Sequence, residues 1–111
     1  MLSIIIPLYN AELHVPNLLN NIKELDLETI EVILVNDGSN DSTELLILDF
    51  ISSLQSTNVR LVNKNNGGVS SARNVGLNNI SCDSLYLAFF DCDDSVSYTH
   101  LRAHETTLHL V

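Results

Sequence analysis

The chain has 111 residues, of which 45% are apolar, and a formal net charge of −9. This length predicts one globular domain, and the acidic balance excludes nucleic acid and anionic membrane surfaces as favoured main partners. Its two cysteines, Cys82 and Cys92, lack disulfide-framework spacing, and no apolar run reaches the ~18 residues of a membrane span, so we expect a cytoplasmic protein.

Apolar runs predict four buried strands, at residues 2–8, 31–36, 59–62 and 85–90. Segments with the apolar spacing of helices lie between them, at 15–25, 45–54 and 69–78. Alternation of strands with connections long enough for crossovers predicts an α/β fold. We expect a Rossmann-like, mostly parallel four-stranded sheet flanked by helices on both faces.

Polar loops follow three of the four predicted strands. They contain Tyr9 and Asn10, then Asp37 to Ser39, and then Asp91 to Asp94. The carboxyl ends of parallel strands share one edge of the sheet, and open α/β sheets bind ligands there. These loops therefore predict a ligand site, although polar loops also occur in α/β domains without any function.

Three aspartates, Asp91, Asp93 and Asp94, stand directly after the last apolar run. Carboxylates crowded together repel one another, and a cation relieves that repulsion. Alternation along a strand places Asp91 and Asp93 on the same side, where their oxygens suit Mg²⁺ or Mn²⁺. A solvated acidic turn is the alternative interpretation.

Four motifs occur together, in a characteristic order and spacing. They are IIIPLYN at 4–10, VNDGSNDST at 35–43, NNGGVSSARN at 65–74 and FDCDD at 90–94. Over about residues 2–95 this combination resembles the family 2 glycosyltransferases, which have the GT-A fold. The resemblance implies that residues 1–94 form a nucleotide-sugar-binding domain.

The resemblance also implies a reaction and a set of site residues. The family transfers a sugar from a nucleotide-sugar, commonly a UDP-sugar, with inversion, and glycans or lipid-linked saccharides are the expected acceptors. By position, Asp93 would be the primary ligand of Mg²⁺ or Mn²⁺, and Asp91 would be a second ligand or would contact the ribose. The implied nucleotide-binding residues are Pro7, Tyr9, Asn10, Asp37, Gly38, Arg73 and Asp91. Without the resemblance, Asp37 is also consistent with a helix cap and Arg73 with a surface arginine.

The chain also departs from the family pattern. The catalytic base of the family lies well downstream of the Asp-x-Asp motif, so the catalytic residue is unknown here and we expect this chain alone to be inactive. Residues 95–111 match no family motif and are expected to lie outside the domain. Alternative functions are a non-catalytic nucleotide-sugar-binding module and a Mg²⁺-binding receiver-like domain. A longer protein of this kind would work in the cytoplasm or at the cytoplasmic face of the membrane.

Overall fold

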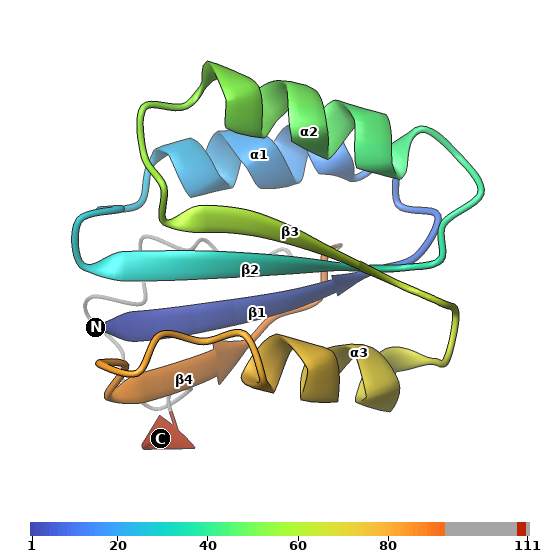
Figure 1. Ribbon diagram of the computed structural model, residues 1–111. Coiled ribbons are helices and arrows are strands. Elements are labelled where there is room, and N and C mark those ends of the chain that lie inside the picture. The colour runs from blue at the N-terminus through green and yellow to red at the C-terminus, as the bar shows by residue number, and fades with distance from the viewer. Residues whose placement is uncertain (93–108, 111) are drawn as a thin grey trace.

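The computed structural model describes residues 1–92 and the backbone of residues 109–110 (Figure 1). Within these residues, three helices and five strands follow one another in the order β1 (Leu2–Leu8), α1 (Val15–Lys23), β2 (Ile30–Asp37), α2 (Thr43–Ser53), β3 (Val59–Lys64), α3 (Val69–Leu77), β4 (Tyr86–Phe89) and β5 (His109–Leu110). The predicted α/β fold class is confirmed. None of the helices in this described part is long and apolar enough to cross a membrane.

The strands form one sheet in the order β3-β2-β1-β4-β5. The first four strands in this order are parallel, as predicted, and β5 pairs antiparallel with β4. The sequence did not indicate β5. The expectation that residues 95–111 lie outside the domain stays a prediction, because residues 93–108 lie outside the described part of the chain.

The helices cover both faces of the sheet: α1 and α2 lie on one face and α3 on the other (Figure 1). Side chains of β1 alternate between these two layers because successive strand residues point to opposite faces. Ile4 and Ile6 pack in the core with Leu18 of α1, whereas Ile5 packs in a second core with Ala72 of α3. The connections change face between β1 and β4, which is where open α/β sheets bind ligands.

Close packing of α3 depends on Gly76. A Cβ atom at this position would overlap the side chain of Ile5 in β1. Only glycine therefore lets α3 approach the sheet this closely, and the approach fixes where the amino end of α3 lies.

Strand β2 carries a buried carboxylate near each end. Glu31 and Asp37 share one face of β2 with Ile33 and Val35, both of which pack in the core under α3. Their side chains are only 1% and 6% exposed, so their charges need partners inside the protein. Asp37 lies at the carboxyl end of β2 and belongs to the candidate site, whereas Glu31 lies at the amino end of the strand.

Glu31 joins four segments of the chain. It accepts hydrogen bonds from the Ser3 hydroxyl in β1, from the Ser81 amide at 2.8 Å and hydroxyl at 2.6 Å, and from Arg60 in β3 at 2.8 Å. Burial alone would raise the pKa of Glu31, but the hydrogen bonds from Ser3 and Ser81 and the charge of Arg60 outweigh it, so that the pKa is lowered. The ionised form therefore stabilises the fold.

We predict that Glu31→Gln lowers the free energy of unfolding at pH 7 by about 1.5–3 kcal/mol, the usual contribution of a hydrogen bond to a charged group. A group with a lowered pKa in the folded state stabilises the fold above its ordinary pKa, here 4.5, and the effect is lost as the pH falls through the folded pKa. The difference in the free energy of unfolding between wild type and Glu31→Gln should therefore become smaller below pH 4.5. Urea unfolding at several pH values measures it, with Glu28→Gln, an exposed site, as control. A difference independent of pH would contradict this role for the charge.

Candidate functional site

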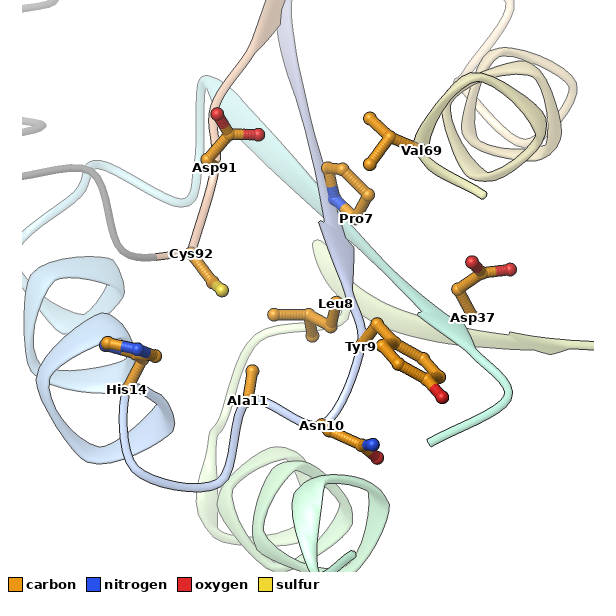
Figure 2. Close-up of a pocket in the computed structure, with 10 residues that line it drawn as sticks. All are labelled: Pro7, Leu8, Tyr9, Asn10, Ala11, His14, Asp37, Val69, Asp91 and Cys92. Atoms are coloured by element: carbon orange, nitrogen blue, oxygen red, sulfur yellow. The ribbon is translucent and has the colours of Figure 1, made fainter. Parts of the chain in front are cut away.

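A cavity of about 430 Å³ opens at the carboxyl ends of the strands, at the change of face between β1 and β4. It is lined by Pro7, Leu8, Tyr9, Asn10, Ala11, His14, Asp37, Val69, Asp91 and Cys92 (Figure 2). Figure 2 shows the two carboxylates, Asp37 and Asp91, on opposite sides of the end of β1. The cavity therefore has an Asp37 side and an Asp91 side.

Most of the residues expected at the site meet in this cavity. Pro7, Tyr9, Asn10, Asp37 and Asp91 all line it, although they come from three separate segments of the chain, at the ends of β1, β2 and β4. Of the other expected residues, Gly38 and Arg73 are not among its lining residues but neighbour Asp37 and Asp91. The predicted metal ligand Asp93 lies outside the described residues.

The carboxylate of Asp37 holds the loop that leads into α3. Oδ1 accepts hydrogen bonds from Lys64 Nζ at 2.6 Å and from the Gly67 amide at 2.9 Å, and Oδ2 accepts one from the Gly68 amide at 2.9 Å. The parallel pairing of β2 with β3 sets Asp37 directly beside Lys64. Asp37 thus binds the segment before α3 in the way that Glu31 binds the segment after it.

Opposing effects act on the ionisation of Asp37. Burial alone would raise its pKa, but the hydrogen bonds from Lys64, Gly67 and Gly68 and the charge of Lys64 outweigh burial and lower the pKa. At neutral pH the group is an ionised carboxylate that accepts hydrogen bonds and donates none.

Gly38 allows the loop after β2 to pass close to the loop before α3. Its φ is +72°, a left-handed conformation that strains other residues, and a Cβ atom there would lie 2.7 Å from the backbone nitrogen of Asn66. The Asp-Gly pair thus combines a carboxylate that holds residues 67–68 with a residue that leaves room for residue 66.

Hydrogen bonds tie the loop after β1 to the loop after β2. The Asn10 amide donates to Ser39 Oγ at 2.9 Å, and Asn10 Oδ1 accepts from the Asn40 amide at 2.8 Å. The Ala11 amide donates to the Thr43 hydroxyl at 2.9 Å. Asn10 has a φ of +47°, a conformation that asparagine tolerates better than most residues. It therefore shapes the cavity as well as lining it.

Asp91 and Arg73 form the other side of the site. Arg73 Nη2 lies 3.7 Å from Asp91 Oδ1, and its guanidinium carbon lies 5.6 Å from the centre of the Phe89 ring. The Asp91 side chain is 61% exposed, so the pair is open to solvent. Arg73 Nε is buried and has no hydrogen-bond partner among the described residues. Arg73 therefore lies beside Asp91 at the cavity, with its side chain 40% exposed and its Nε without a partner among the described residues.

The described residues supply part of a metal site. Among residues 1–92 no group of three or more histidine, cysteine, aspartate or glutamate side chains could hold a metal ion. Asp91 nevertheless offers an exposed carboxylate in the cavity, and Mg²⁺ and related ions commonly bind one or two carboxylates together with phosphate and water. The Asp91 carboxylate therefore fits a metal ion that takes some of its ligands from the protein and the others from a bound phosphate.

Sequence reasoning missed Lys64, His14 and Cys92. Lys64 stands at the end of a predicted strand, but its contact with Asp37 depends on the register of β2 and β3, which the sequence leaves open. His14, the residue just before α1, lines the cavity. Cys92, which stands between two aspartates in the sequence, lines it as well. The position of Cys92 inside the acidic motif was the one available signal.

Known proteins resemble this chain in sequence and in architecture. Residues 3–104 match the family described as Glycosyl transferase family 2. The minor teichoic acid biosynthesis protein GgaA of Bacillus subtilis (strain 168) is 37% identical over 106 residues, a match that covers 93% of this chain and 24% of that protein. The chain thus spans about a quarter of that relative.

Solved structures agree with the sequence comparison. S. aureus TarS 1-349 in complex with UDP-GlcNAc superposes with a TM-score of 0.78 at 28% identity, covering 92% of this chain and 29% of that one. The mannosyltransferase PcManGT from Pyrobaculum calidifontis, solved with GDP-Man and Mn²⁺, has a TM-score of 0.76 at 24% identity over 83% of this chain and 27% of its own, and shows the shared fold alone. With the match over residues 3–104, these findings show that the chain belongs to glycosyl transferase family 2.

Proposed function

We propose that this chain forms the donor-binding part of an inverting glycosyltransferase that takes its sugar from a UDP-sugar. The observation that carries the proposal is the single cavity lined by Pro7, Tyr9, Asn10, Asp37 and Asp91, which come from separate motifs. The UDP-GlcNAc bound by TarS supports the choice of nucleotide. Family membership favours this function over a receiver-like domain.

The Asp37 side of the cavity suits the nucleobase. Uracil carries an imide N–H, and an ionised carboxylate is a strong acceptor for it. Asp37 Oδ2 accepts one hydrogen bond from the described residues, and a carboxylate oxygen can accept two. Tyr9, half exposed in the same cavity, offers an aromatic face to the base or ribose.

The Asp91 side suits the diphosphate and a metal ion. Arg73 supplies a guanidinium next to Asp91, and arginine binds phosphate oxygens through two parallel hydrogen bonds. Asp91 and Asp93 would hold Mg²⁺ or Mn²⁺ together with the diphosphate. When bound, the metal would neutralise the charge of the leaving nucleoside diphosphate.

The acceptor in this proposal is a glycan or a lipid-linked saccharide, and the location is the cytoplasm or the cytoplasmic face of a membrane.

We predict that the 111-residue chain binds UDP and that Mn²⁺ strengthens the binding at least about tenfold, because a diphosphate beside carboxylates is repelled until a cation neutralises it. Calorimetric titration with UDP in Mn²⁺ and in EDTA measures the ratio, and inorganic diphosphate serves as a control for the phosphates alone. Equal affinity in Mn²⁺ and EDTA would remove the metal from the proposal, and absence of UDP binding would reject it.

We also predict that Asp93→Asn and Asp91→Asn both reduce the Mn²⁺-dependent gain in UDP affinity, with the larger loss for Asp93→Asn. Each variant keeps the side-chain shape and removes one ligand charge. The control is Asp83→Asn, which removes the same charge from an exposed position that does not line the cavity. A larger loss in Asp91→Asn would reverse the assignment of the primary ligand, and a gain unchanged in both variants would exclude both residues as ligands.

A further inference from the structure

Lys64 is a charged residue next to the cavity that the proposed function leaves without a role. It ends β3, its side chain is 13% exposed, and its Nζ lies 2.6 Å from Asp37 Oδ1. It also donates a hydrogen bond to the Asn65 carbonyl. A lysine this buried, with its charge set against one carboxylate, is not a solvated surface residue.

The hydrogen bonds that Asp37 accepts within the protein determine which of its acceptor positions remain for a ligand. Oδ1 accepts two hydrogen bonds, from Lys64 and Gly67, so its acceptor capacity is used. Oδ2 accepts one, from Gly68, and keeps one position among the described contacts. The carboxylate is 94% buried, so its orientation is set by these partners and not by solvent.

We propose that Lys64 is a positioning residue that keeps Asp37 an acceptor-only carboxylate, so that the cavity selects nucleotides whose base presents a ring N–H. The inference rests on the proposed function and gives a physical reason for its choice of a uracil nucleotide, a reason that guanine would also satisfy and cytosine and adenine would not. Uracil N3 and guanine N1 carry a hydrogen, whereas cytosine N3 and adenine N1 are acceptors. An acceptor facing the ionised Asp37 would be left unpaired in a buried site, which is costly.

Loss of the lysine would change the chemistry of this position. Without the cation, only the Gly67 and Gly68 amides would oppose burial, so the pKa of Asp37 would rise; the protonated form can donate a hydrogen bond and would no longer reject cytosine. The lowered pKa of Asp37 in the present structure agrees with this role of Lys64.

The other groups around Asp37 leave Lys64 as its charged partner. The loop at residues 65–68 contains two asparagines and two glycines and contributes backbone amides. Tyr9, His14, Asp91 and Cys92 are the other titratable residues that line the described cavity. Among the described residues, Lys64 is the charged group that contacts the carboxylate.

The test compares UDP with CDP, which differ in the base alone, by calorimetry in Mn²⁺ on the full 111-residue chain. Wild type should prefer UDP at least about tenfold at pH 5, where its Asp37 is still ionised, the factor expected for one hydrogen bond to a charged group. Lys64→Gln and Lys64→Met should reduce the preference to within about threefold, and Lys64→Arg should restore it because it keeps the charge and the donor. Lys23→Met, at an exposed lysine outside the cavity, is the matched control.

A pH profile separates positioning from simple loss of stability. Between pH 7.5 and 5, the UDP affinity of Lys64→Gln relative to Lys23→Met should fall at least about threefold as Asp37 takes up a proton, whereas that of Lys64→Arg should stay constant. A folded Lys64→Gln with the wild-type preference and profile would overturn the inference.

The wild-type chain tests the inference even if the Lys64 variants do not fold. Equal binding of UDP and CDP by wild type would overturn this inference and leave the proposed function standing. Binding of neither nucleotide would overturn both.

Discussion

The arrangement of the site depends on two buried carboxylates in one strand. Glu31 and Asp37 stand near opposite ends of β2, on the face that α3 covers, with Ile33 and Val35 between them. Asp37 accepts hydrogen bonds from the amides just before α3, and Glu31 accepts them from Ser81 just after it. The apolar middle of the strand holds the helix against the sheet, and the charged ends fix the segments on either side.

This arrangement explains how a polar cavity forms on a largely apolar sheet. Buried carboxylates are costly unless they are paired and hydrogen-bonded, and each of these has a cation and two or more hydrogen-bond donors. At the Asp37 end the partners lie beside the cavity, so one carboxylate both supports the loop and faces a ligand. At the Glu31 end the partners are structural, and the carboxylate is sealed at the amino ends of the strands.

Much of this organisation could be predicted from the sequence. The four apolar strands and the helical spacing between them predicted the parallel sheet, and the shared edge of parallel strands predicted that Tyr9, Asp37 and Asp91 would meet. The pairing of Asp37 with Lys64 could not be predicted, because it depends on strand register. The apolar positions of α2 also mislead: Leu45 and Leu48 are 69% and 45% exposed, and a helix with apolar residues on several sides does not reveal which side is buried.

The central claim is that a nucleotide binds at the carboxyl ends of β1, β2 and β4. The most direct measurement is the change in each backbone amide chemical shift of the 111-residue chain when UDP and a diamagnetic divalent ion, Mg²⁺, are added. We predict that the largest changes occur at residues 8–11, 37–39, 66–69 and 91–92. Shifts concentrated instead between α1 and α2, or near Leu27 and Asn58 at the amino ends of the strands, would contradict it.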